Sequence, residues 1–351
     1  MKILITGGCG FVGSNLAIYL KNKFKKSNIF VIDNLFRNGS IYNQKRLQDN
    51  DIKVIIGDIR FEKDLKNIPK FDLLIDCAAD PSALSGINEG LSYLIETNVN
   101  GTLNCLNLVK KFNAKIIFVS SSRVYSHEKI NNLKYKVANN EIIPLKNNIG
   151  FDKKRGISEL FDTSGLKTFY GFTKLTGENL IKEYSSIFNI DFIINRSGVI
   201  TGPWQWGRVD QGFVSYWLMA YVFKKKLKYI GYGGLGYQVR DILNINDFCK
   251  LIEVQLSDFS KYKNEIFNIG GGSHSKISLF NLTKICQNIF KTNYAPKQTK
   301  ESRKGDIPYY VSDISKINKL SKWRPNTEIN KTVEEIYFWI IKNKSKLIKL
   351  I

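Results

Sequence analysis

Tyr170 and Lys174 stand four residues apart and are the side chains with the clearest capacity for chemistry. On a helix this spacing places both on one face, so the lysine ammonium would lie beside the phenol. A phenol with a pKa of about 10 is a poor base, and a neighbouring cation lowers that pKa. A hydroxyl from Ser120, Ser121 or Ser122 would share the substrate proton. The pattern predicts proton transfer at a substrate hydroxyl, although the spacing alone also suits a structural pair.

A glycine-rich turn between an apolar run (residues 3–6) and a helix-like segment predicts a dinucleotide site. Glycines occupy the first, fourth and seventh positions of residues 7–13, a spacing that lets the backbone approach a pyrophosphate at a helix N-terminus. Asp33 ends the next apolar run, 20 residues after Gly13, where its carboxylate would accept hydrogen bonds from the adenosine ribose and repel a 2′-phosphate. Arg37 argues the other way, because its guanidinium would neutralise such a phosphate. The arrangement favours NAD over NADP.

Two further strand ends carry residues suited to the same ligand. Asp58 follows the apolar run 53–57 and can accept a hydrogen bond from an adenine amino group, although an ordinary turn also accounts for it. Ala78 and Ala79 follow the run 73–77, and their small side chains would let the backbone approach a dinucleotide. Plain helix–sheet packing is compatible with this interpretation.

These residues need a scaffold, and the chain alternates two kinds of segment that supply one. Short apolar, β-branched runs suit strands buried on both faces of a sheet and occupy residues 3–6, 29–33, 53–57, 73–77, 116–120 and 192–195. Segments with helical spacing of apolar residues lie between them, at residues 14–24, 97–112 and 170–188. The alternation predicts an α/β fold with a Rossmann-type, doubly wound parallel sheet.

The later chain predicts a second, smaller lobe. Residues 129–167 are polar and Asn-rich and indicate a long loop, and residues 209–223 form a helical run within aromatic and Gly-rich stretches. We predict a nucleotide-binding domain of residues 1–197 and 239–270. The substrate lobe would comprise residues 198–238 and 271–351.

Composition narrows the class of protein. Of the 351 residues, 43% are hydrophobic, which is enough for a large core, and 53 Lys and Arg against 31 Asp and Glu give a net charge of +22. The lysines are spread along the chain, which favours a basic surface suited to a phosphorylated substrate over nucleic-acid binding. We therefore expect no nucleic-acid partner.

Histidine and cysteine usage argues against several kinds of site. With only His127 and His274, a His-based triad or a multi-His metal site is not expected, and we predict no metal. The five cysteines are scattered without CxxC spacing, which is typical of reduced thiols in a cytoplasmic protein. The longest apolar stretch, residues 213–223, is shorter than the ~20 residues that span a bilayer, so we expect no membrane partner.

In combination, the motifs resemble the extended short-chain dehydrogenase/reductase family, also described as NAD-dependent epimerases and dehydratases. The matching features cover nearly the whole chain and occupy residues 7–13, 33, 57–58, 98–102, 120–125, 170–174, 238–242, 303–307, 313–316 and 323–325. The resemblance implies NAD as cofactor, a nucleotide-sugar substrate, and a homodimer built on the helices at residues 97–112 and 170–188.

The resemblance also implies roles for individual residues. Tyr170, Lys174 and Ser121 would be catalytic, with Ser122 as the near alternative to Ser121. Cofactor contacts would come from Gly7, Gly10, Phe11, Val12, Gly13, Asp33, Asn34, Arg37, Asn38, Asp58, Ile59, Ala78, Ala79, Asn98, Ser120, Tyr170, Lys174 and Val199. Substrate contacts would come from Ser121, Ser122, Arg123, Gln211, Arg240 and Arg303, with Arg240 and Arg303 on the diphosphate.

Within the family, the chain is most similar to CDP-paratose (CDP-tyvelose) 2-epimerases, through residues 33–40, 202–212 and 231–236. Sugar 4,6-dehydratases carry an acidic pair just after the catalytic hydroxyl, and Ser122-Arg123 stands there instead, which argues against dehydration. Two features depart from the family pattern: Ser126 replaces a glycine, and the segment before Tyr170 is longer than in 4-epimerases. The alternatives are a UDP-sugar 4-epimerase, a net reductase or dehydrogenase, and a non-catalytic RNA-binding relative.

Overall fold

The computed structural model describes residues 1–82, 84–87, 90–207 and 211–348, and the chain divides into two compact units. Unit 1 comprises Met1–Val124, Phe169–Arg196 and Cys249–Phe267. Unit 2 comprises Tyr125–Thr168, Ser197–Phe248 and Asn268–Ile351. The predicted division places residues 125–168 and 239–248 in the nucleotide-binding domain, whereas in the structure they group with unit 2.

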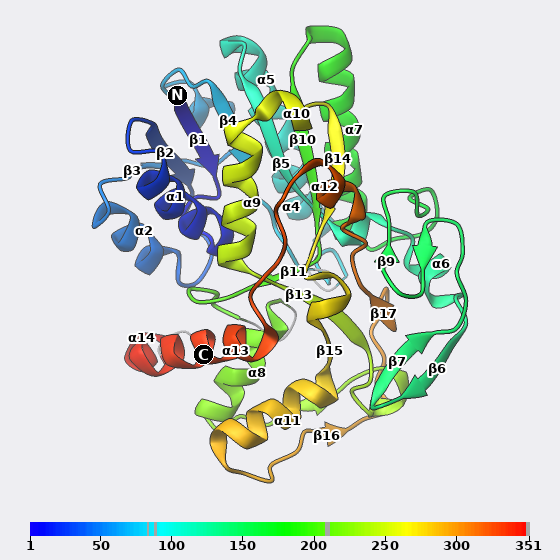
Figure 1. Cartoon of the computed structure of the whole chain (residues 1–351). Coiled ribbons are helices and arrows are strands. Elements are labelled where there is room, and N and C mark those ends of the chain that lie inside the picture. The colour runs from blue at the N-terminus through cyan, green and yellow to red at the C-terminus, as the bar shows by residue number, and fades with distance from the viewer. Residues whose placement is uncertain (83, 88–89, 208–210, 349–351) are drawn as a thin grey trace. The chain divides into compact units, whose positions relative to one another are not determined.

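Unit 1 is built on a seven-stranded sheet with the strand order β14-β10-β5-β4-β1-β2-β3 (Figure 1). The strands are β1 (Lys2–Thr6), β2 (Asn28–Asp33), β3 (Lys53–Ile56), β4 (Leu73–Asp76), β5 (Lys115–Ser121), β10 (Phe192–Ser197) and β14 (Glu265–Ile269). β1 lies between β2 and β4 and is parallel to both, with Ile3 opposite Ile29 on one side and Leu73 on the other. The predicted doubly wound fold is confirmed, since buried apolar runs do form the strands.

The helices of unit 1 follow the strands in alternation. They are α1 (Phe11–Lys23), α2 (Ser40–Gln48), α3 (Glu62–Leu65), α4 (Leu91–Ile95), α5 (Gly101–Phe112), α7 (Phe169–Phe188), α10 (Phe259–Tyr262) and most of α9 (Ile245–Ser257). The predicted helix at residues 97–112 begins as a π-helical turn, η1 (Glu96–Asn100). Leu106 and Val109 of α5 and Ile181 of α7 pack with sheet residues such as Leu74 in one buried core.

Unit 2 holds a four-stranded sheet and a separate core. The sheet contains β11 (Val199–Thr201), β13 (Val239–Asn244), β15 (Lys276–Ser278) and β17 (Tyr309–Tyr310), and β12 (Lys228–Tyr229) pairs with β16 (Lys297–Gln298). The helical segments are α8 (Phe213–Val222), η3 (Tyr232–Gly234), η4 (Gly272–Ser275), α11 (Leu279–Phe290), α12 (Ser315–Leu320), α13 (Ile329–Lys342) and α14 (Lys344–Leu347). Trp217, Leu218, Ile336 and Trp339 lie in their shared core.

The long loop predicted at residues 129–167 is wrong, because this segment has structure of its own. It contains most of α6 (His127–Asn131), the hairpin β6 (Tyr135–Ala138) and β7 (Glu141–Pro144), and the short pair β8 (Phe151–Asp152) and β9 (Gly156–Ile157). Asn139 and Asn140 have positive φ angles of 52° and 58°, as a type I′ hairpin turn requires. Glu141 forms an ion pair with Lys276 at 2.8 Å, which ties the hairpin to the rest of unit 2.

The two ends of this insertion, defined as residues 125–168, are fastened to each other. The backbone N–H of Ser126 donates to the carbonyl of Asp162 at 3.0 Å, and that of His127 donates to the carbonyl of Leu166 at 3.0 Å. The Lys129 ammonium also forms an ion pair with the Asp162 carboxylate. The chain therefore leaves and returns at one place.

Asp241 is a fully buried carboxyl group in unit 2 whose titration should affect stability. Its Oδ2 accepts hydrogen bonds from the N–H groups of Gly272 (3.0 Å) and Ser312 (3.1 Å), and burial raises its pKa to about 6. Because the unfolded-chain pKa is about 4, the folded protein binds the proton more tightly. The Asp241 contribution should therefore weaken as pH rises from about 4 to about 6, by up to about 3 kcal/mol.

Asp241→Asn isolates this effect, because the amide oxygen still accepts both hydrogen bonds and does not titrate. Urea unfolding of both proteins between pH 4.5 and 7.5 should show a free-energy gap that favours the variant at pH 7.5 and closes toward acid pH. Parallel pH profiles for the two proteins would contradict the assignment.

Candidate active site

Tyr170 lies in the first turn of α7, and its phenol forms a hydrogen bond with Ser121, the last residue of β5. The two side chains are buried, with exposed fractions of 9% and 8%. The backbone N–H of Arg123, in the short helix η2 (Ser122–Val124), donates to Ser121 Oγ at 3.2 Å. A Cβ placed on Gly171 would lie 2.0 Å from the Arg123 carbonyl oxygen, so α7 packs directly against η2. This packing fixes Ser121 against Tyr170.

The surroundings of Tyr170 have opposing effects on its pKa, and the net result is a raised pKa because burial has the largest effect. Loss of solvent raises the pKa above its usual value, while the hydrogen bond to Ser121 and the charge of Arg123 lower it. Asp80 and Arg37 also act on it, the first raising the pKa and the second lowering it. The protein therefore holds Tyr170 as a neutral phenol at rest.

Lys174 is buried, and its hydrogen bond is to the backbone of β5. Its ammonium donates to the carbonyl of Val119 at 2.9 Å, and burial lowers its pKa while the charge of Asp76 raises it. Asp76 is fully buried and accepts a hydrogen bond from Thr6 at 2.5 Å. A buried carboxylate and an open carbonyl attract an ammonium more strongly than a neutral phenol does. The ammonium that was expected beside Tyr170 is thus hydrogen-bonded to the carbonyl of Val119.

Ser120 faces the opposite side of β5 from Ser121. Its hydroxyl donates to Glu178 Oε1 at 2.5 Å, and Glu178 forms a buried ion pair with Arg196 at 2.7 Å. With exposed side-chain fractions of 6% for Arg196 and 0% for Glu178, this is a closed cluster. Of the three serines that the sequence left open, Ser121 is the one that meets Tyr170, and Ser122 is half-buried in η2.

The glycine turn after β1 has the geometry that a pyrophosphate needs. Gly7 has a φ of 59°, and a Cβ there would lie 2.8 Å from the Cα of Ala78. A Cβ on Gly13 would lie 2.4 Å from the Gly7 carbonyl oxygen. Gly10 is the N-cap of α1 and gives no side-chain cap to the first turn, where Phe11 and Val12 lie. The glycines leave the backbone N–H groups at this helix N-terminus accessible, and such donors bind the phosphates of a dinucleotide.

Asp33 is fixed at the end of β2 by two backbone donors. Its Oδ2 accepts from the N–H of Cys9 at 2.9 Å and its Oδ1 from the N–H of Leu35 at 2.8 Å. Each carboxylate oxygen keeps a lone pair, so the group can still accept hydrogen bonds from ribose hydroxyls. The dinucleotide residues predicted around this turn therefore fit NAD.

The other predicted adenosine contacts are already engaged within unit 1. Asp58 accepts from the Asn34 side chain at 2.8 Å and forms an ion pair with Arg60 at 2.7 Å. Ile59 is buried beside it, and Asn38 is exposed. This ties the loop after β2 to the loop after β3.

Arg37 and Asn98 both meet Asp80, a residue that the sequence analysis missed. The Arg37 guanidinium forms an ion pair with the Asp80 carboxylate. Asn98, in the π-helical turn, accepts from the N–H of Asp80 at 2.7 Å and donates to its carbonyl at 3.1 Å and to Thr173 at 3.0 Å. Asp80 follows Ala79 in a loop with no recognisable spacing, so nothing in the sequence marks it.

Unit 2 brings two of the predicted substrate residues into one cluster. Arg240, on β13, forms an ion pair with Asp306 at 3.0 Å and donates to the carbonyl of Ile307 at 2.7 Å. The N–H of Asp306 in turn donates to the carbonyl of Arg303 at 3.2 Å. Gln211 and Val199 also belong to unit 2, while residues 208–210 of the resemblance motif lie outside the described residues.

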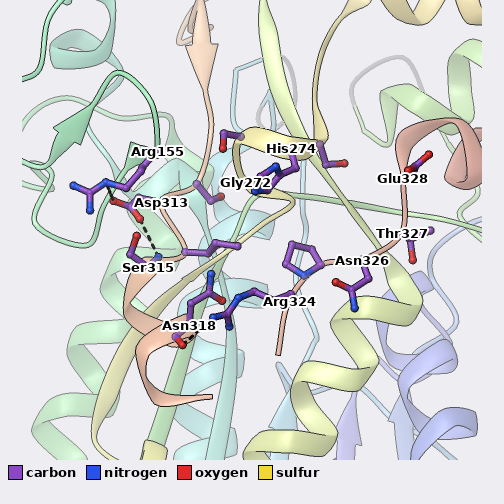
Figure 2. A pocket seen from close by; sticks show the side chains of 15 residues that line it. Arg155, Gly272, His274, Asp313, Ser315, Asn318, Arg324, Asn326, Thr327 and Glu328 are labelled. Atoms are coloured by element: carbon purple, nitrogen blue, oxygen red, sulfur yellow. Dashed lines mark hydrogen bonds and ion pairs between the residues drawn. The ribbon is translucent and has the colours of Figure 1, made fainter. Parts of the chain in front are cut away.

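Unit 2 also contains a pocket of about 500 Å³, lined by residues other than the predicted substrate residues (Figure 2). Arg155 reaches over it to Asp313 at 3.5 Å, and Asp313 also accepts from the N–H of Ser315 at 2.9 Å. Arg324 donates to the carbonyls of Trp323 (2.6 Å) and Ser321 (3.1 Å). No predicted site residue lines this pocket.

Membrane-spanning helices and metal-binding clusters are both absent from the described residues. In the described ranges, no helix has the length and apolar character needed to cross a membrane. Groups of three or more His, Cys, Asp or Glu side chains that could hold a metal ion are also absent from the part of the chain that the structure describes.

Comparison with known proteins adds to this geometry. The sequence model of the NAD dependent epimerase/dehydratase family matches residues 3–270. The chain is 29% identical to CDP-paratose 2-epimerase of Salmonella typhi over 97% of its own length and 99% of that protein.

Two solved structures are similar over nearly their full length. UDP-glucuronic acid 4-epimerase of Bacillus cereus, solved in complex with UDP-glucuronic acid and NAD, has a TM-score of 0.79 at 26% identity, covering 97% of this chain and 99% of that one. UDP-glucose 4-epimerase of Bifidobacterium longum has a TM-score of 0.80 at 21% identity, covering 99% and 100%.

Proposed function

The chain belongs to the NAD dependent epimerase/dehydratase family, and on this premise we propose that it is an epimerase of a nucleotide-linked hexose, resembling CDP-paratose 2-epimerase. The observation that carries the proposal is the hydrogen bond between Ser121 and Tyr170. The residue following Ser122 is Arg123, where a sugar dehydratase would have an acidic pair. An intact proton-transfer pair without that acidic pair favours epimerisation over loss of water.

In the proposed reaction the phenolate form of Tyr170, which forms from the neutral phenol of the resting site, takes the proton of a sugar hydroxyl, and Ser121 holds that hydroxyl in place. Removal of the hydride from the carbon that bears this hydroxyl leaves a transient keto-sugar, and NAD held at the glycine turn of unit 1 would supply the hydride acceptor. Return of the hydride to the opposite face of the ketone inverts that carbon. Alternatively, loss and return of a proton inverts the carbon next to the ketone, and the hydride then returns to the ketone, so neither route changes the net redox state. The positive charge of Arg123 assists by favouring the phenolate form of Tyr170.

The nucleotide sugar tests the proposal directly. Incubation with CDP-, UDP- and GDP-linked sugars, read by NMR, should show inversion at one sugar carbon for a CDP-linked hexose, without consumption of free NAD(H). Inversion at C4 of UDP-sugars alone would favour the 4-epimerase alternative, and net consumption of NAD(H) would favour a reductase. In deuterated water, deuterium at the inverted carbon would indicate proton return, and its absence would indicate hydride return.

We also propose that Arg240 and Arg303 hold the substrate diphosphate, because a guanidinium binds phosphate oxygens in a bidentate manner. Arg240→Ala should raise KM about 10- to 100-fold, the scale of one lost hydrogen-bonded charge, and leave the NAD dissociation constant unchanged. Arg155→Ala, which breaks the ion pair with Asp313, is the matched control in unit 2. An unaltered KM in Arg240→Ala would place the diphosphate elsewhere.

The homodimer is proposed on α5 and α7, which lie side by side in unit 1 (Figure 1). Phe169, Phe172 and Ile187 of α7 are 44%, 51% and 65% exposed and fall on one face of the helix. Light scattering at micromolar concentration should give twice the chain mass, and Phe172→Glu should halve it. A monomeric mass for the unaltered protein would refute the dimer.

A further inference from the structure

One ion pair joins two loops that flank the glycine turn of the NAD site. Arg37 and Asp80 each stand four residues beyond their strands, β2 and β4. In the sheet β1 lies between these strands, and the glycine turn begins where β1 ends. The carboxyl ends of parallel strands meet at one edge. The Arg37–Asp80 ion pair therefore spans the position in front of the turn where the pyrophosphate would lie.

Aromatic contacts join the same segments. The ring of Phe36, next to Arg37, lies 5.2 Å from the ring of Tyr93 in α4, measured between centroids. The guanidinium of Arg60, in the loop after β3, lies 4.7 Å from the centroid of the same Tyr93 ring. The loops after β2 and β3 are thus linked to the segment after β4 by an ion pair and a shared aromatic ring.

The two ends of the ion pair are anchored very differently. Asp80 Oδ2 accepts from Ser85 at 2.7 Å, Asn98 holds both its backbone groups, and its side chain is 11% exposed. Arg37 is 30% exposed and sits in the loop before α2, between the exposed residues Phe36 and Asn38. Asp80 is therefore the more buried end of the ion pair, and Arg37 is the end that lies on the more exposed loop.

We propose that Asp80 is a positioning residue that holds Arg37 across the bound dinucleotide, and that opening this ion pair limits the release of NAD. Slow release of the cofactor suits a reaction in which the same NAD molecule must return the hydride that it has accepted. The inference rests on the NAD dependence of the family and on the contacts of unit 1, and it does not depend on the identity of the sugar.

A different role for Arg37 would give the opposite behaviour. If Arg37 left Asp80 to bind a cofactor phosphate directly, Asp80 would compete with the cofactor for the guanidinium. Removing the Asp80 charge would then slow release and strengthen binding, above all of NADP with its 2′-phosphate. The two roles therefore predict changes of opposite sign in one measurement.

The experiment follows release of NADH from the loaded full-length protein by stopped-flow fluorescence, with excess NAD+ as the chase. Asp80→Asn and Arg37→Gln should each speed release about tenfold or more, as loss of a charged, partly buried hydrogen bond implies. The double variant should release NADH no faster than either single variant. Lys228→Gln, which breaks an exposed ion pair with Glu301 in unit 2, should leave release unchanged.

Charge exchange distinguishes an ion pair from general damage to the fold. Arg37→Asp combined with Asp80→Arg should bring release back to within about threefold of the unaltered protein, while either reversal alone should speed it. Added salt should speed release in the unaltered protein and have little effect on Asp80→Asn. Unchanged or slower release in Asp80→Asn and Arg37→Gln would overturn the proposal. Because Arg37 is half-buried on a loop, its variant remains informative even if Asp80→Asn fails to fold.

Discussion

Tyr170→Phe should lower turnover about 100-fold or more while leaving fold, NAD binding and dimerisation intact. The substitution removes one oxygen from a buried ring, and with it the group that carries the proton and the partner of Ser121. Loss of a general acid or base costs a factor of this size. Turnover with the nucleotide sugar identified by NMR is the measurement.

Controls on the same helix sharpen this result. Tyr184, also on α7, donates to Asn107 at 2.8 Å, and Tyr184→Phe removes the same atom away from the site. Its turnover should match that of the unaltered protein. Ser121→Ala should slow turnover less than Tyr170→Phe, because water or Ser122 can replace part of its hydrogen bond. Unaltered turnover in Tyr170→Phe would show the proposed mechanism to be wrong.

Glu178→Ala should destabilise the protein by about 3 to 5 kcal/mol, the range for stripping the partner from a buried charge. The Arg196 guanidinium would remain in a core where its side chain is 6% exposed, and the Ser120 hydroxyl would lose its acceptor. The free energy of urea unfolding at neutral pH is the measurement.

A double variant and a surface control show whether the loss of stability comes from the unpaired charge. Glu178→Leu combined with Arg196→Met should be less destabilised than Glu178→Ala, because no unpaired charge remains. Glu334→Ala, which breaks an exposed ion pair with Lys331, should leave the free energy of unfolding within experimental error. Stability equal to that of the unaltered protein in Glu178→Ala would mean that Arg196 finds another partner.

Six of the seven strands of the central sheet could be predicted, because a strand buried on both faces is mostly apolar. The seventh, β14, carries Glu265 and Asn268 among its five residues and is not among the predicted runs. The hairpin of β6 and β7 could not be predicted either, because its strands are only four residues long and mostly half-buried, and its clearest signal is the Asn139-Asn140 pair. Two consecutive asparagines are compatible with a turn in any loop. The hairpin is held in place by the contacts of Glu141 and Ile142 with the rest of unit 2. Marginal strands depend on what they pack against.

Prediction of the candidate site was limited in the same way, because the contacts of single side chains depend on other elements. Alternation along β5 means that Ser120 and Ser121 face opposite sides, but which one meets Tyr170 depends on how α7 lies on the strand. The hydrogen bond of Lys174 goes to the carbonyl of Val119, which lies on a strand far away in the chain. The spacing along one helix identified Tyr170 and Lys174 as candidates. Their hydrogen-bond partners come from other elements and could not be predicted from that spacing.

The fastened ends of the insertion have an evolutionary consequence. Because the chain leaves after Val124 and is tied back to itself through Ser126, His127, Asp162 and Leu166, the length of what lies between does not set the distance from Ser121 to Tyr170. That distance is set by the direct packing of Gly171 on the Arg123 carbonyl. We therefore expect that residues 127–167 can change in length or sequence during evolution without moving Ser121 away from Tyr170.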